Sequence, residues 1–123
     1  MEDFYHLIVW KKCREFKKAI TEIVKKFPRS EQYRLVDQAI RSARSITANL
    51  AEGHGRFHFQ ENIQFCRQAR GSLSETLNHM IDAFDENYIG REELLTLKGI
   101  YNECIRLVNG YISYLKKCKN QLG

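Results

Sequence analysis

Proline is almost absent from this sequence, and glycine is scarce. Among the 123 residues there is one proline, Pro28, and there are seven glycines. These two residue types interrupt regular structure most often, so their scarcity favours a few long helices over many short strands. A chain of this length is expected to form one domain around a single core.

Long apolar runs and a secretion signal are also missing. No uninterrupted apolar stretch approaches the roughly 20 residues of a membrane-spanning helix, and the first residues do not follow a signal-peptide pattern. Hydrophobic residues make up 43% and charged residues 28% of the chain, a balance typical of folded soluble domains. We therefore expect a cytoplasmic protein without a membrane partner.

Motifs for metal binding and catalysis are lacking as well. The four cysteines are widely separated and form no C-x-x-C pair: Cys13, Cys66, Cys104 and Cys118. In a cytosolic helical protein they are expected to be small buried hydrophobic residues. His54 and His58 are four residues apart, but a glycine-containing break lies between them, so helical ligand spacing does not apply. We predict no metal site, no cofactor and no enzymatic activity.

The chain does contain apolar residues spaced three and four apart, which is the period of helices packed along one face. This pattern runs through four segments, namely residues 7–26, 31–52, 59–87 and 91–119. Because the connections between them are short, successive helices should be antiparallel neighbours. We predict an all-α protein with one domain, folded as an up-and-down antiparallel four-helix bundle.

The breaks between these segments have specific residues. Phe27-Pro28 ends the first helix because the residue before a proline avoids the α region. Ser30 is a candidate N-cap for the second helix. Gly53 and Gly55 can adopt the positive φ angles that end a helix. The segment from Asn87 to Gly90 forms the last turn.

Polar residues occur at or beside the expected seam between the second and third helices. Arg70 falls on or beside the buried stripe of the third helix, and a buried charge needs a partner. We predict a structural polar cluster where the two helices meet, made of Asn49, Glu52, Arg56, Arg70 and Glu75. Acid–base catalysis is the alternative for these groups, but no nucleophile, metal set or second base accompanies them. Gly71, in mid-helix, predicts close approach of a neighbouring backbone.

Charge is distributed unevenly along the chain. The net charge is +5, while residues 57–87 carry two basic against five acidic side chains, or −3. Lys11, Lys18 and Lys25 recur every seven residues and so share one side of the first helix. They form either a solvated face or a phosphate-binding strip. Arg41 and Arg44 are either nucleic-acid contacts or partners for the acidic third helix.

The fourth helix carries more apolar surface than one intramolecular seam requires. One stripe of spacing four and three runs from Leu94 to Leu115. Five further apolar residues are expected outside it: Ile100, Ile105, Leu107, Ile112 and Tyr114. Contact between subunits is the natural use of this surplus, which predicts a homo-oligomer.

Several short motifs occur in one order along the chain: Ile8-Val9-Trp10, Phe27-Pro28, Arg44-Ser45-Ile46, Asn49-Leu50-Ala51-Glu52-Gly53, Arg56 and Ala69-Arg70-Gly71-Ser72. In these motifs the chain resembles the bacterial four-helix bundle proteins that include the 23S ribosomal RNA intervening-sequence proteins. Thr47-Ala48 departs from that pattern, where a Pro-containing step is commoner. The resemblance implies a four-helix bundle, a ring-like homo-oligomer, commonly a pentamer, and an association with RNA.

The same fold is similar to the accessory protein of diversity-generating retroelements, which implies a protein partner such as a reverse transcriptase. Our first hypothesis is a non-enzymatic, homo-oligomeric binding protein whose basic surface contacts RNA or DNA mainly through phosphates. The second is a protein–protein scaffold that binds no nucleic acid. The third, an enzyme using Glu52, Arg70 and Glu75, has the least support.

Overall fold

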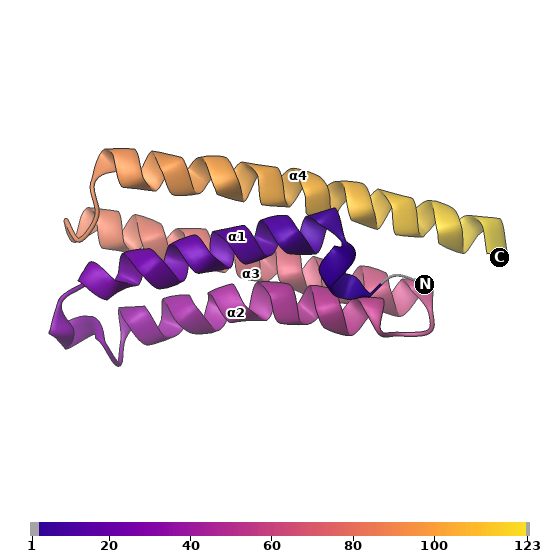
Figure 1. The fold of residues 1–123 in the computed structure, drawn as a ribbon, viewed down its shortest axis with the longest axis horizontal. Helices are drawn as coiled ribbons and strands as arrows, with labels where there is room; N and C mark the ends of the chain where they lie inside the picture. Colours follow the sequence, from indigo (N-terminus) through magenta and orange to yellow (C-terminus); the bar gives the residue numbers. More distant parts are fainter. Residues whose placement is uncertain (1–2, 123) are drawn as a thin grey trace.

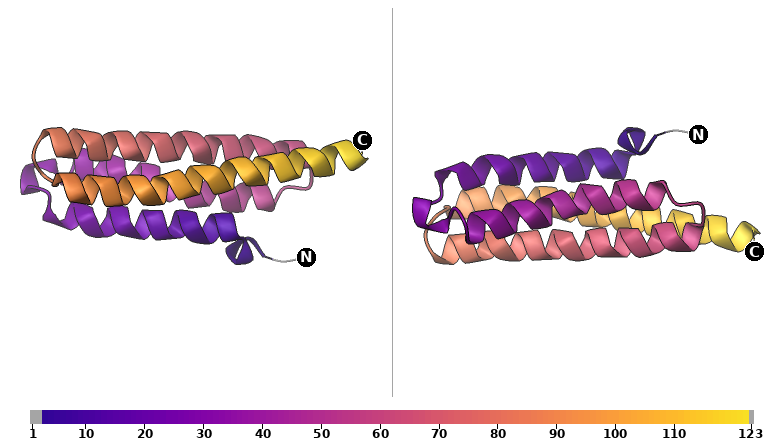
Figure 2. Two further views of the ribbon diagram at one scale, coloured as in Figure 1. Left: turned by 90° about the horizontal axis from the view of Figure 1, so that it is seen from above. Right: turned by 90° about the horizontal axis from the view of Figure 1, so that it is seen from below.

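The computed structural model describes residues 3–122, which form four long helices and three short 3-10 turns. The long helices are α1 (Ile8–Ile23), α2 (Leu35–His54), α3 (Phe59–Asp85) and α4 (Arg91–Leu122). They run alternately up and down, side by side, and the last turns of α4 extend past the ends of α2 and α3 (Figures 1 and 2). The predicted four-helix bundle is confirmed. None of the described helices combines the length and the apolar character of a membrane span.

The connection between α1 and α2 differs from the prediction. Short 3-10 turns at Val24–Lys26 and Arg29–Glu31 flank Pro28. The second helix begins at Leu35 instead of residue 31, and its N-cap is Arg34, whose side chain makes no capping bond. The prediction that Ser30 caps this helix is therefore wrong. Most of the stability of a helix comes from packing one of its faces against the rest of the protein. No residue from 28 to 34 is buried, and side chains begin to pack against the bundle only from Leu35 onward, so the helix begins there.

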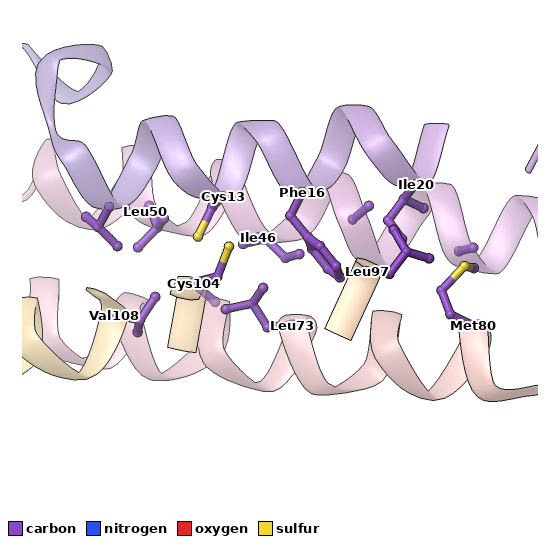
Figure 3. Close-up of a cluster of buried hydrophobic side chains, with 14 of the residues drawn as sticks. Cys13, Phe16, Ile20, Ile46, Leu50, Leu73, Met80, Leu97, Cys104 and Val108 are labelled. Atoms are coloured by element: carbon purple, nitrogen blue, oxygen red, sulfur yellow. The ribbon is translucent and has the colours of Figure 1, made fainter. Parts of the chain in front are cut away.

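The core lies along the central axis and is formed by the predicted stripes of all four helices. Its largest fully buried side chains include Phe16 and Ile20 of α1, Ile46 and Leu50 of α2, and Leu73 of α3. Figure 3 shows these side chains pointing into the space between the helices. Burial of apolar area contributes about 25 cal/mol per Å², and this continuous core holds the four helices in place.

Three of the cysteines belong to the core. Cys13, Cys66 and Cys104 are buried free thiols, as predicted, whereas Cys118 is only half-buried, so the prediction of burial is wrong for that residue. The sulfur atoms of Cys13 and Cys104 point toward each other across α1 and α4 (Figure 3). The hydrogen bond with the Cys104 thiol, followed by burial, raises the pKa of Cys13, and burial raises the pKa of Cys66 to about 11. Both thiols therefore stay protonated near neutral pH and act as hydrophobic residues.

The α2–α3 seam is close because small residues line it. Gly53 is buried inside α2 and does not adopt a positive φ, so the prediction that it ends the helix is wrong. A Cβ at Gly53 would lie 2.6 Å from Asn62 Oδ1 and 2.8 Å from Phe65 Cβ of α3. Gly53 is thus required for close approach of the two helices.

Two pairs of hydroxyl groups bridge the same seam. Ser42 Oγ lies 2.7 Å from Thr76 Oγ1, and both residues are buried. Ser72 Oγ donates to Ser45 Oγ at 2.9 Å. Since buried polar groups need hydrogen-bond partners, these pairs fix how α2 and α3 sit against each other along the seam.

Gly71 does not mediate close packing, contrary to the prediction. It lies on the exposed face of α3, and a Cβ added there would meet nothing within 4 Å. We expect Gly71→Ala to stabilise the isolated subunit by about 0.4–1 kcal/mol, because alanine reduces the freedom of the unfolded chain and suits a helix interior. Chemical denaturation would measure this gain, and a loss of stability would show that another chain packs against Gly71.

Candidate nucleic-acid interface

The basic row predicted on the first helix is present on the surface of α1. Lys11, Lys18 and Lys25 are all exposed, and their spacing of seven residues, two helical turns, aligns them along the helix. Lys25 Nζ lies 2.9 Å from Glu22 Oε2. No hydrogen bond or ion pair involves the ammonium groups of Lys11 and Lys18 within residues 3–122. The row therefore presents two unpaired cations and one weakly paired cation.

Arg41 and Arg44 are further cations, on the neighbouring helix α2. Both are exposed. Arg41 Nε pairs with Asp37 Oδ2 at 2.9 Å, one turn earlier in the same helix. In the described chain Arg44 has no ion pair. The alternative that these arginines pair with the acidic third helix is wrong within one subunit. Asp82 and Asp85, which supply part of that acidity, are exposed on α3.

The predicted polar cluster of Asn49, Glu52, Arg56, Arg70 and Glu75 is only partly formed. Arg56 Nη2 pairs with Glu52 Oε1 at 2.9 Å, and this part of the prediction is confirmed. Arg56 Nη1 also approaches Glu61 Oε2 at 3.7 Å, and its guanidinium lies 5.0 Å from the centroid of the Phe65 ring. Arg56 is therefore held by two carboxylates and an aromatic face at the α2–α3 connection.

The other members of that cluster are dispersed. Arg70 Nη1 donates to Asn109 Oδ1 of α4 at 2.7 Å instead of pairing with Glu52 or Glu75. Glu75 lies 3.3 Å from His79 Nε2. Asn49 Nδ2 donates to the Ser45 backbone oxygen at 2.9 Å. The predicted single cluster is wrong because Arg70 lies on the side of α3 that faces α4, not α2. Without a shared site, these groups cannot act together in acid–base chemistry.

Sequence reasoning missed the hydroxyl pairs of the α2–α3 seam and a polar contact between α3 and α4. Asn62 is buried, and its Nδ2 donates to Tyr111 Oη at 3.3 Å. A signal for the hydroxyl pairs was present, since Ser42, Ser45 and Asn49 share one side of α2 at spacings of three and four. The sequence contained no comparable signal for the long-range contact of Asn62.

The apolar residues predicted for subunit contact fall into three groups. Ile100, Ile105 and Leu107 are half-buried, and Tyr114 is 58% exposed. Ile112 is only 5% exposed and belongs to the core, so its assignment to a subunit contact is wrong. The reason is that α4 packs against both α1 and α3, and its buried face is wider than one stripe (Figure 1).

Grooves follow the α1–α4 seam. One groove of about 560 Å³ is lined by Ala19 and Ile23 of α1 and by Leu97 and Ile100 of α4, among others. Lys26 and Glu93 form an ion pair at the same groove. The Gly90 backbone N–H, and then Lys26, lower the pKa of Glu93, so this carboxylate stays ionised.

A second groove of about 400 Å³ lies at the other end of the same seam. It contains Ile8, which is 72% exposed, together with Leu107 and Gly110. The α1–α4 face thus combines apolar side chains with charged residues. Within residues 3–122, no three His, Cys, Asp or Glu side chains gather as a set of metal ligands.

The fold and its surface define a single-domain four-helix bundle that carries most of its charged side chains on its outer faces. The chain belongs to the 23S rRNA-intervening sequence protein family, whose model matches residues 5–110.

Comparison with solved structures supports the same architecture. A crystal structure of a protein of unknown function from the S23 ribosomal protein family of Bacteroides thetaiotaomicron matches with a TM-score of 0.79. The match has 23% identity and covers 86% of this chain and 96% of that one. At this identity the likeness supports the fold alone. No curated protein sequence matches the chain.

Proposed function

We propose that this chain is a non-enzymatic, cytoplasmic, homo-oligomeric protein that binds nucleic acid through phosphates, using the basic surface of α1 and α2. The observation that carries the proposal is the row of Lys11, Lys18 and Lys25, in which two ammonium groups have no partner in the described chain. Phosphate contacts by such cations release counterions and supply most of the sequence-independent affinity. The family name, which refers to an intervening sequence of 23S rRNA, agrees with an RNA ligand.

The paired residues of this surface are compatible with the same role. Lys25–Glu22 and Arg41–Asp37 are exposed pairs within one helix. Such pairs contribute only about 0–1 kcal/mol, so a phosphate can replace the carboxylate at little cost. Arg44 adds a guanidinium that can bind a phosphate with two hydrogen bonds. The surface has no groove-reading element, so we expect weak sequence specificity.

We further propose that the α1–α4 face joins copies of this chain, with the pentamer of the family resemblance as the expected assembly. Ile8 and Leu107 supply exposed and half-buried apolar area at one end of the seam, and Ile100 supplies it at the other. Burying such area against a second copy is favourable. Lys11 borders this face, in a groove shared with Ile8 and Leu107, whereas Lys18 and Lys25 are exposed and line none of the described α1–α4 grooves.

Fluorescence anisotropy across a salt series tests the proposed binding, with structured RNA and duplex DNA as probes and the oligomer mass measured in parallel. We expect the logarithm of the affinity to fall linearly with the logarithm of salt concentration. The triple variant Lys11→Glu, Lys18→Glu, Lys25→Glu should weaken binding and reduce that slope by about three, since each lost phosphate contact removes about 0.9.

A matched control changes the net charge equally at other exposed positions: Arg67→Glu, Arg91→Glu and Lys98→Glu on α3 and α4. This control should retain a steeper salt dependence than the α1 variant. Equal losses in both variants would mean that net charge, not the α1 row, attracts the ligand. An intact oligomer that binds neither probe at low salt would instead favour a scaffold for a protein partner, such as a reverse transcriptase.

A further inference from the structure

A cavity of about 340 Å³ lies at the end of the bundle where α2 connects to α3. Its walls come from three parts of the chain: Leu7 before α1, the segment from His54 to Asn62, and Tyr111, Tyr114 and Leu115 of α4. This volume is within the range of about 300–1,000 Å³ typical of small-ligand sites. The cavity is separate from the basic row of α1.

Aromatic rings dominate the lining of this cavity. Phe57, in the α2–α3 connection, is 92% exposed. Tyr114 is 58% exposed, and its ring is nearly parallel to that of Tyr111, with an interplanar angle of 15° and centroids 6.3 Å apart. Two exposed aromatic faces, one from a connection and one from α4, thus border a single cavity.

Cationic and polar groups accompany these rings. Arg56 lines the cavity and is fixed by Glu52 and Glu61. Lys119 Nζ donates to Gln60 Oε1 at 2.6 Å, which places an ammonium group beside the start of α3. Lys117 follows Tyr114 by three residues, so it lies on the same side of α4. The lining of the cavity is therefore largely aromatic, and the charge of Arg56 in its wall is balanced by Glu52 and Glu61. The edge lysines Lys117 and Lys119 of α4 lie near the cavity without lining it.

The cavity also offers a hydrogen-bond donor in its wall. Tyr111 Oη accepts the hydrogen bond from Asn62 Nδ2, so its own proton remains available to a ligand. Burial is the main cause that raises the pKa of Tyr111, which keeps the phenol protonated near neutral pH. A planar ligand with acceptor atoms at its edge would match this arrangement.

We propose that this cavity binds an unpaired nucleobase of a single-stranded segment, stacked on the rings of Phe57 and Tyr114. Aromatic platforms combined with neighbouring cations are the pattern of single-strand binding sites, because every base has a face that can stack. Phosphates on either side of the base then contact the edge lysines. This inference rests on the proposed nucleic-acid binding and adds to it a preference for unpaired bases.

The test compares fluorescein-labelled ten-nucleotide strands of oligoadenylate, in ribose and deoxyribose forms, with abasic strands that carry the same number of phosphates. The adenylate strands should bind more tightly than the abasic ones. Phe57→Ala and Tyr114→Ala should each weaken adenylate binding by about 5-fold to 100-fold and leave the abasic affinity unchanged. Each substitution should weaken the binding of the ribose and the deoxyribose adenylate strands by the same factor.

Tyr33→Ala is the matched control, because Tyr33 is 91% exposed and belongs to the connection between α1 and α2, which lies at the other end of the bundle from the α2–α3 connection (Figure 1). It should change neither affinity. A second measurement uses wild-type protein only: a 2-aminopurine in the strand should lose fluorescence as it stacks on the rings.

The two proposals fail differently. If neither these strands nor structured RNA nor duplex DNA bind at low salt, the proposed function itself is wrong; if structured RNA or duplex DNA binds and the single strands do not, only the base-binding cavity is overturned. If abasic and adenylate strands bind equally with a normal salt dependence, phosphate binding stands and the base-binding cavity is overturned. An unquenched 2-aminopurine in a bound strand would overturn the cavity in the same way.

Discussion

Replacing Phe16 with alanine should destabilise the subunit by about 3–5 kcal/mol, the cost typical of removing a buried aromatic ring. Phe16 has no solvent-exposed surface. Its ring reaches from α1 toward the centre of the bundle (Figure 3), where its centroid lies 6.3 Å from that of Tyr101 on α4. Packed helices relax only partly around such a deletion, so the missing ring should leave a cavity. Small domains have free energies of unfolding of only about 5–15 kcal/mol, so this loss would be a large fraction of the total stability.

Thermal and urea unfolding would measure this effect. Phe16→Leu is the control, since it keeps most of the apolar volume and should cost much less. The midpoint temperature should fall by several degrees for each kcal/mol lost. A small loss for Phe16→Ala would show that the bundle can repack around α1, and the core described here would then be looser than its burial indicates.

Replacing Gly53 with alanine should also destabilise the protein, by about 1–3 kcal/mol, although alanine is the better helix former. The added Cβ would lie 2.6 Å from Asn62 Oδ1 and 2.8 Å from Phe65 Cβ. Asn62 could move its side chain, at the expense of its bond to Tyr111. The Cβ of Phe65 is attached to the backbone, so relief there requires α2 and α3 to separate.

Gly55→Ala provides the matched control for this prediction. Gly55 has a φ of −77°, and a Cβ there would meet only backbone oxygens at 3.6 and 3.7 Å, which is ordinary contact. The same substitution two residues away should therefore be nearly neutral. Urea unfolding of both variants would compare them. A Gly53→Ala protein as stable as Gly55→Ala would refute close packing at this point of the seam.

The two glycines of the family-like motifs show where sequence reasoning succeeds and where it does not. Gly53 and Gly71 both lie within helices, and the sequence predicted close approach only for Gly71. The structure assigns that role to Gly53 and leaves Gly71 exposed. A glycine looks the same in a sequence whether its missing side chain faces a neighbouring helix or solvent, because that depends on how the helix is rotated within the bundle.

The candidate site, too, was predicted only in part from the sequence. The exposed row of Lys11, Lys18 and Lys25 follows from their spacing and from the position of the apolar stripe of α1. The partner of Arg70 does not follow from spacing, since a long side chain on the edge of a stripe can turn toward either adjacent helix. The cavity beside Tyr114 was not predicted at all. Its walls come from segments separated by about half of the chain.

The sequence by itself determined the number of helices, their approximate bounds and most residues of the core, because these depend on a local period of 3.6 residues and on a few interrupting residues. Only the tertiary structure decided which polar groups meet, which glycine is essential and where aromatic rings border a cavity. Those features arise from contacts between helices far apart in the chain, and the relative rotation and position of the packed helices set them.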